Sequence, residues 1–90
     1  MLSENYRQFD ALGDSNRMRI LELFTDIPEL TPTLICQMLG LSTPLFAHHL
    51  RILKAAKLIN VKKSGRVKML SLNKDEFQRL AFILNDIVKG

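Results

Sequence analysis

The 90-residue sequence lacks several features that would place it in a particular class of protein. Its one cysteine, Cys36, excludes an intramolecular disulfide framework and fits a reducing cytoplasm. No apolar run exceeds the five residues Leu80–Leu84, which is too short to span a membrane. Residues 1–10 carry charges of both signs and no apolar core segment, so they do not form a secretory signal. With no internal repeat or Pro/Gly-rich linker, we expect one cytoplasmic domain over residues 1–90.

Acidic residues are missing from half of the chain. Residues 30–74 contain no Asp or Glu and eight Lys or Arg, whereas the other 45 residues contain five basic and nine acidic side chains. The net charge of +4 is therefore concentrated in one segment. Such one-sided positive charge is the electrostatic signature of a nucleic-acid-binding surface. The alternative is that the basic residues only solvate one face, and charge alone does not decide between the two.

Hydrophobic spacing and capping residues predict five helices. Leu2, Tyr6 and Phe9 recur at i, i+4 and i+7, as on one face of a helix that ends near Gly13. The later helices begin at good N-terminal caps, which are Asp14, Thr31, Ser42 and Asn73. The predicted helices span approximately residues 2–12, 15–26, 32–39, 43–57 and 74–89.

The third and fourth predicted helices and the segment after them suggest a common arrangement. A short helix, a tight Gly40-Leu41 turn and a longer basic helix are typical of a helix-turn-helix unit. Residues 58–63 and 66–72 then alternate imperfectly around Ser64-Gly65, which predicts a β-hairpin with a basic tip. The expected fold class is mainly α with a small β-hairpin: a winged helix-turn-helix of five helices and a two-stranded wing.

One arc of the helix predicted over residues 43–57 is polar, basic or small and carries no acid, as entry into the major groove of DNA requires. Phe46, Leu50 and Leu53 lie on the opposite arc, with Leu45 and His49 on its flank. The cations of the hairpin tip can straddle phosphates or enter the minor groove. The predicted DNA-binding residues are Ser42, Thr43, Pro44, Ala47, His48, Arg51, Lys54, Lys62, Lys63, Arg66 and Lys68. The alternatives are an ordinary helix with a solvated face and a charged edge strand protected from aggregation.

Two segments resemble the ArsR-type winged-helix repressors. Residues 11–24, ALGDSNRMRILELF, resemble the family's ALGDPTRLRILxLL, and residues 39–53, LGLSTPLFAHHLRIL, resemble its LGLSQPTVSxHLKxL. The similarity extends over roughly residues 6–73 and includes the Gly65-Arg66 turn of the wing. It implies that residues 42–57 form a recognition helix and that the first and last helices form a dimer interface.

The last predicted helix is apolar around most of its circumference, so something must cover it. A domain this small has little core of its own, yet 47% of its residues are hydrophobic, which suggests apolar surface shared with a second copy. Combined with the resemblance, this predicts a homodimer. The residues expected at its interface are Leu2, Tyr6, Phe9, Phe77, Leu80, Phe82, Ile83, Leu84 and Ile87.

The chain departs from the family pattern at positions that matter for function. The family usually has Thr at the position of Leu45 and often Ser at that of Ala47, both facing DNA, so polar contacts to bases are lost there. Its metal-sensing members carry ELCVCDLA on the third helix, where this chain has Thr31 and Thr33 in place of the two thiolates. Residues 74–90 also contain no His, so we expect no metal site and no cofactor.

Other reactive side chains have simpler explanations. Cys36 lies where the family has a small Ala, so we expect a buried small hydrophobe, with a redox switch as the alternative. His48 and His49 diverge by about 100° on a helix, which makes them poor co-ligands, and His49 is expected to pack half-buried. No Ser/His/Asp set, paired carboxylates or Gly-rich phosphate loop is evident, so we do not expect an enzyme.

These patterns predict a homodimer that binds double-stranded DNA sequence-specifically and regulates transcription as a repressor, without a metal-sensing site. The fourth helix would enter the major groove, with the hairpin on the flanking backbone. One alternative is an interaction module whose basic face docks an acidic protein, which Leu45 and Ala47 favour. Another is a repressor that responds to oxidation of Cys36 or to an unidentified small-molecule effector.

Overall fold

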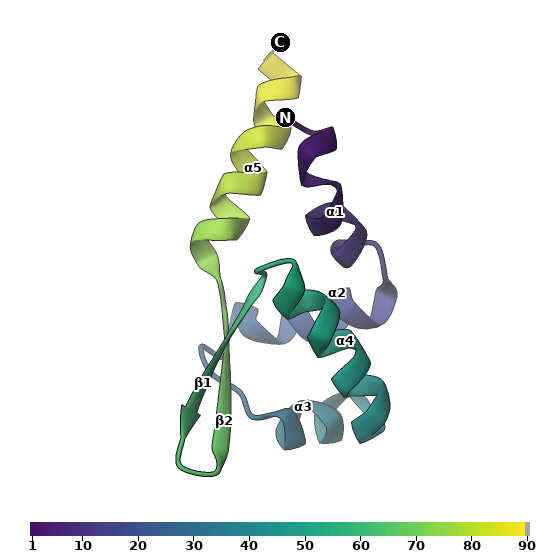
Figure 1. Ribbon diagram of the computed structural model, residues 1–90, viewed down its shortest axis with the longest axis vertical. Coiled ribbons are helices and arrows are strands. Elements are labelled where there is room, and N and C mark those ends of the chain that lie inside the picture. The colour runs from purple at the N-terminus through teal and green to yellow at the C-terminus, as the bar shows by residue number, and fades with distance from the viewer. Residues whose placement is uncertain (90) are drawn as a thin grey trace.

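The computed structural model describes residues 1–89 and confirms the predicted set of five helices and one hairpin (Figure 1). The helices are α1 (Tyr6–Leu12), α2 (Ser15–Glu22), α3 (Pro32–Leu39), α4 (Thr43–Ala55) and α5 (Lys74–Lys89), and the antiparallel strands are β1 (Ile59–Ser64) and β2 (Val67–Leu72). Short 3-10 turns at Ser3–Asn5 and Leu23–Thr25 precede α1 and follow α2. The first, second and fourth helices are therefore shorter than predicted.

The helices of the helix-turn-helix begin at the expected caps. Thr31 Oγ1 and Ser42 Oγ each accept the backbone N–H three residues on, at 3.2 Å, and Pro32 and Pro44 lie in the first turns of α3 and α4. These bonds satisfy N–H groups that the helices leave unpaired at their starts. A proline there loses no hydrogen bond, because its position needs no backbone donor.

The same two helices end in matching C-terminal caps. Gly40 adopts a left-handed conformation with φ of 66° after α3, and Lys57 adopts one with φ of 61° after α4. In the second cap, Lys57 N–H donates to the carbonyl of Lys54 at 2.9 Å, and Leu58 N–H donates to that of Leu53 at 3.0 Å. This is the Schellman pattern, in which glycine is the favoured residue. The chain thus places a side chain where a left-handed backbone disfavours one.

The hairpin has a two-residue turn at Gly65-Arg66, because Ser64 pairs with Val67. This is one position later than the strand alternation indicated and is the turn that the family resemblance included. Gly65 has a φ of 64°, which a tight turn of this kind requires. On its other edge, β2 exchanges two backbone hydrogen bonds with Leu30, at 3.0 and 2.8 Å. These bonds fix the hairpin to the start of the helix-turn-helix.

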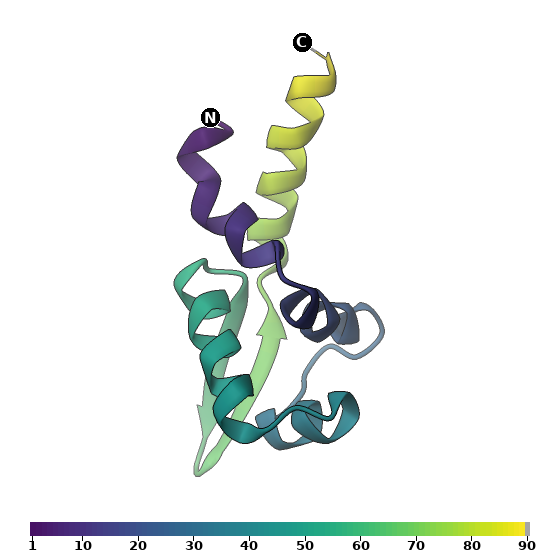
Figure 2. The same cartoon turned by 90° about the vertical axis from the view of Figure 1, so that its right-hand side faces the viewer.

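Every helix and both strands contribute to one hydrophobic core, which includes Ala11, Ile20, Ile35, Leu53, Ile59, Leu70 and Leu80. The molecule measures 46 × 23 × 22 Å. Its long axis separates two ends: α1 and α5 lie at one, and the hairpin turn and the start of α4 lie at the other, as Figure 2 also shows. Within residues 1–89, no helix is both long and apolar enough to cross a membrane.

A buried arginine, which the sequence did not single out, links α1, α2 and α4. Arg17 is 9% exposed and donates from Nε to the carbonyl of Ala11 at 2.7 Å and from Nη2 to that of Asp10 at 3.3 Å. Its Nη1 lies 3.3 Å from Nδ1 of His49 in α4. Asp14, which caps α2 by accepting the Arg17 N–H at 3.0 Å, lies 3.8 Å from the same ring nitrogen. Three helices are thereby held at one point.

His49 is buried more deeply than expected, with 5% of its surface exposed. Because arginine can only donate, Nδ1 must accept from Arg17, which leaves the ring proton on Nε2. Nε2 finds no hydrogen-bond partner among the described residues. Burial lowers the pKa of His49 below its ordinary value, and the nearby charges of Arg17 and His48 add to this effect while Asp14 opposes it. The folded protein therefore holds His49 neutral.

Lys57→Gly should stabilise the fold by about 0.5–1 kcal/mol, because glycine adopts the left-handed conformation without the steric cost of a side chain. The matched reverse change, Gly40→Ala, should destabilise by about 1–2 kcal/mol. A Cβ at Gly40 would meet no atom within 4 Å, so that cost is purely conformational. Urea unfolding of both variants measures the two effects. A less stable Lys57→Gly protein would show that the lysine side chain contributes more than its backbone costs.

The free energy of unfolding should fall as the pH drops below about 6.5, the ordinary pKa of histidine. In that range the unfolded chain binds a proton at His49 and the folded protein does not. The slope of the free energy of unfolding against pH therefore reaches at most about 1.4 kcal/mol per pH unit. His49→Gln, which keeps an acceptor for Arg17 but does not titrate, should remove this slope below about pH 6.5. The exposed neighbour provides a control, since His48→Gln should retain it. Equal slopes in the wild type and the His49→Gln variant would contradict a neutral, buried His49.

Candidate nucleic-acid interface

Helix α4 buries one side and presents the other to solvent. Phe46 and Leu53 are almost completely buried, which follows from their seven-residue spacing on one face. The seven residues of α4 and its cap that the sequence assigned to DNA are all exposed: Ser42, Thr43, Pro44, Ala47, His48, Arg51 and Lys54. None of the residues from 42 to 55 is acidic, so this surface has no group that would repel phosphate.

Leu45 differs from its expected place on the flank of the packed side. Its side chain is 40% exposed, although it is a large hydrophobe in the first turn of α4. Together with Pro44 and Ala47, it makes the start of the helix apolar on its outer side. The polar residues Thr43, His48 and Arg51 border this region, so hydrophobic and hydrogen-bonding groups share one exposed surface.

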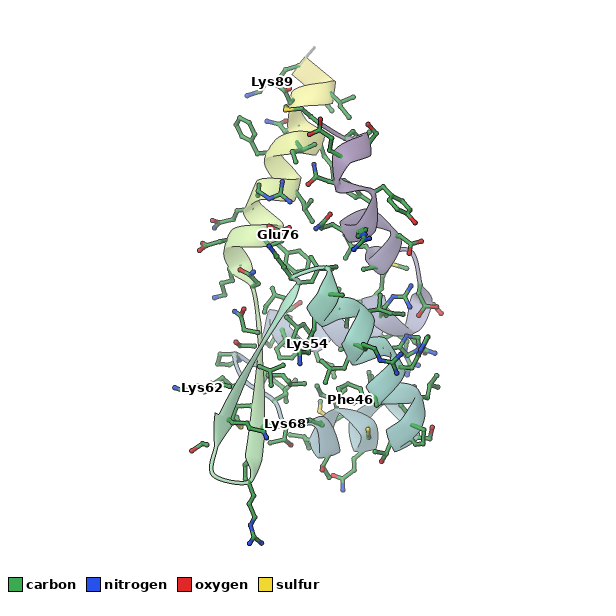
Figure 3. The ribbon with its side chains drawn as sticks, in the orientation of Figure 1. Phe46, Lys54, Lys62, Lys68, Glu76 and Lys89 are labelled. Carbon is green, nitrogen blue, oxygen red and sulfur yellow. The ribbon has the colours of Figure 1, made fainter. Side chains whose placement is uncertain are left out.

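The register of the hairpin divides its four predicted cations between different directions. Lys63 pairs with Lys68, on the same face as the Val61–Leu70 pair that packs against the core. Lys62 pairs with Met69 on the opposite face. Figure 3 shows Lys68 and Lys54 directed toward each other across the space between hairpin and α4, and Lys62 pointing away. Arg66 lies in the turn itself and is exposed.

A groove of about 750 Å³ separates the C-terminal part of α4 from the hairpin. We call it the basic groove; its polar lining residues are Lys54, Lys57, Asn60, Lys63, Lys68 and Asn73. Lys54 and Lys68 also line an adjoining hollow with Ala47, Leu50 and Arg51, so the groove continues onto the exposed side of α4. The sequence had placed Lys57 in the basic segment without a role and Asn73 only as the cap of the last helix, and nothing in the pattern had indicated Asn60.

The basic groove concentrates positive charge without compensation. No acidic residue is among those that line it. Lys63 and Lys68 stand directly opposite each other on neighbouring strands, and like charges in that position destabilise a hairpin. A polyanion in the groove would remove this repulsion and accept hydrogen bonds from the ammonium groups. The geometry therefore favours a ligand with several negative charges.

The nine residues expected at a dimer interface fall into three groups. Leu80 and Ile83 are buried in the core of the chain itself, which corrects the expectation that they offer surface to a partner. Phe9 and Phe77 are partly buried against the same core. The exposed members are Leu2, Tyr6, Phe82, Leu84 and Ile87. They lie on α1, α5 and the segment before α1, at the end of the molecule opposite the hairpin turn.

Cys36 is partly exposed and packs against the edge of the core, so it is less buried than expected. Thr31 and Thr33, which stand in place of the family's thiolates, lie at the start of α3, where Thr31 serves as the cap. Among residues 1–89, no three His, Cys, Asp or Glu side chains gather where they could share a metal ion.

Comparisons with known proteins agree with this architecture. The chain is 35% identical over 83 residues to the transcriptional repressor SdpR of Bacillus subtilis (strain 168), which covers 91% of each chain. An ArsR-like transcriptional regulator from Rhodococcus sp. RHA1 superposes with a TM-score of 0.87 at 26% identity, covering 98% of this chain and 82% of the other. The homodimeric winged helix-turn-helix DNA-binding domain Mb0332 from Mycobacterium bovis shares the fold, with a TM-score of 0.77 at 20% identity, covering 98% and 81%.

The family model for bacterial regulatory proteins of the arsR family matches residues 14–61, from the cap of α2 into β1. This span contains the whole helix-turn-helix and more than half of the chain. Since the family consists of regulatory proteins, the expectation that the chain is not an enzyme is confirmed. The chain belongs to the ArsR family of winged helix-turn-helix transcriptional regulators.

Proposed function

We propose that this regulator is a homodimeric repressor that binds double-stranded DNA sequence-specifically and has no metal-sensing site. The observation that carries the proposal is the continuous acid-free surface formed by the exposed side of α4 and the basic groove. A surface of one charge sign that spans a helix-turn-helix fits the DNA backbone on both sides of a major groove. The similarity to a protein named as a transcriptional repressor supports the sign of regulation.

In this proposal the first two turns of α4 enter the major groove and the phosphate backbone passes through the basic groove. Thr43, the exposed first residue of α4, offers a hydroxyl that can donate to a phosphate at the groove edge. His48 and Arg51 point from the exposed side toward base edges or phosphates. Lys54 and Lys68 flank the backbone from helix and hairpin. Arg66, in the exposed turn, reaches the flanking DNA beyond it.

A second copy would bind through the apolar end of the molecule. Leu84 is 48% exposed and Ile87 more so, although both continue the stripe that begins with the buried Leu80. Exposed leucine and isoleucine on a helix that leaves the body of the domain are typical of a homodimer interface. Tyr6 of α1 adds aromatic surface at the same end. Mb0332 is a homodimer of the same fold, and two-fold symmetry would place two α4 helices about 34–36 Å apart on one face of the duplex.

The alternative function is a protein-interaction module, and the exposure of Leu45 is the observation that favours it. An acidic protein partner would also bind in the basic groove. The two functions differ in their salt dependence, because each phosphate contact releases condensed counterions from DNA and an acidic protein carries no comparable counterion layer. A titration of duplex DNA at several salt concentrations therefore separates them.

Replacing the lysines of the basic groove should weaken DNA binding evenly across sequences. Removing one lysine–phosphate interaction should reduce the slope of log affinity against log salt by about 0.9. We expect this of Lys68→Ala and Lys63→Ala, which share one face of the hairpin and line the basic groove. Lys62→Ala is the matched control, because it removes the same charge from the opposite face of the hairpin. Fluorescence anisotropy from about 50 to 200 mM salt measures the slopes. If Lys62→Ala had the largest effect, the backbone would not run through the groove.

Leu84→Glu should convert the dimer into a folded monomer. Burial of the exposed half of Leu84 contributes about 1 kcal/mol per copy, so removing it from both copies raises the dimer dissociation constant at least roughly 30-fold. The buried carboxylates add further cost. Leu34→Glu on α3 is the matched control, since Leu34 is 43% exposed and far from α5. Sedimentation equilibrium gives the mass and circular dichroism the helix content. A wild-type protein that is monomeric at micromolar concentration would refute the interface.

A further inference from the structure

The start of α4 exposes three apolar side chains within four positions. Pro44, Leu45 and Ala47 are all exposed, and Leu45 is the largest of them. They lie at the end of the molecule away from α1 and α5, so the proposed dimer interface does not cover them. The N-terminal residues of a recognition helix are those that approach base edges. The helix therefore brings a small hydrophobic surface to the floor of the major groove.

The major groove offers few apolar groups to such a surface. Its base edges carry hydrogen-bond donors and acceptors, and the thymine C5-methyl is the apolar group that distinguishes one standard base from the others. We propose that Leu45, with Pro44 and Ala47, reads thymine methyl groups and is the specificity-determining residue at the start of α4. This inference rests on the proposed function and adds the chemical feature by which the regulator selects its site.

The neighbouring polar groups are less available for reading bases at this point. Ser42 Oγ accepts the N–H of Leu45 at 3.2 Å and so is engaged in capping α4. Thr43 is the remaining hydroxyl of the first turn. His48 and Arg51 supply hydrogen bonds only from the second turn onward. Recognition by the first turn consequently depends more on methyl contacts than on hydrogen bonds.

The size and surroundings of the patch favour a base over a protein partner. A stable protein interface buries about 800 Å² on each side, whereas two of these three residues are a proline and an alanine. Cations and hydroxyls border the patch and no acid lies within residues 30–74. A polyanion with isolated methyl groups matches this combination, and a hydrophobic protein surface does not.

Deoxyuridine provides a direct test, because it differs from thymidine only by the methyl group. Duplexes that bind the wild-type protein are first selected from random DNA, and each thymine is then replaced singly by uracil. Removing one methyl that the protein touches should weaken binding about fourfold, as expected for one buried carbon. The Leu45→Ser protein, which has no methyl group at this position, should lose this penalty at one or more positions when assayed on the same duplexes. A penalty caused by altered DNA shape would persist in that variant.

Leu34→Ser is the control for the substitution, because it makes the same chemical change on α3 at a similarly exposed leucine. It should leave every uracil penalty unchanged. Equal affinity for thymine and uracil at all positions would overturn the inference, as would penalties that remain the same in Leu45→Ser. In both cases the wild-type protein still selects and binds duplex DNA, so the proposed function stands. Failure to bind any duplex would overturn both.

Discussion

The buried guanidinium of Arg17 is the interaction on which the position of α4 depends. Arg17 donates hydrogen bonds to the carbonyls of Ala11 and Asp10 near the end of α1, and its Nη1 donates to Nδ1 of His49 in the middle of α4. A buried charge that loses its partners costs several kcal/mol, so these contacts act as a unit. The cluster also includes a carboxylate, since Asp14 both caps α2 and lies 3.8 Å from Nδ1 of the neutral His49. Hydrogen bonding to the Arg17 N–H holds the pKa of Asp14 below its ordinary value, which keeps it charged.

This arrangement places the carboxylate of the buried cluster and the lysines of the basic groove on different sides of α4. The carboxylate that the fold needs lies behind α4, on the side that packs against α1 and α2. The opposite side of α4 and the hairpin can then remain free of acid, although that leaves the like charges of Lys63 and Lys68 opposite each other on neighbouring strands. The hairpin tolerates this because Leu70 is buried and hydrogen-bonded to Leu30. Packing of the hairpin against the core thus stabilises it against the repulsion between these two lysines.

Most of the fold could be predicted because it is encoded locally. Caps such as Thr31 and Ser42, and Gly40 at the turn, act on their own neighbours and can be recognised from spacing. The Arg17 cluster could not, because it joins residues 32 positions apart and arginine is usually a surface residue. The basic groove was only partly predictable: the charge of its lysines was evident, but the face each one occupies depends on strand register. A shift of one residue would exchange Lys62 with Lys63, which composition does not reveal.

Leu45 shows why an exposed hydrophobe should be considered together with its setting. A single exposed leucine is ordinary on a soluble domain and by itself indicates nothing. Here it stands in the first turn of a helix that the buried Arg17–His49 contact holds rigidly, beside groups that attract phosphate. Phosphate contacts fix the register of a helix on DNA but do not distinguish sequences, so selectivity must come from the few groups that approach the bases. Because Pro44, Leu45 and Ala47 are apolar, the proposed selectivity of this chain for DNA sequence rests on methyl contacts.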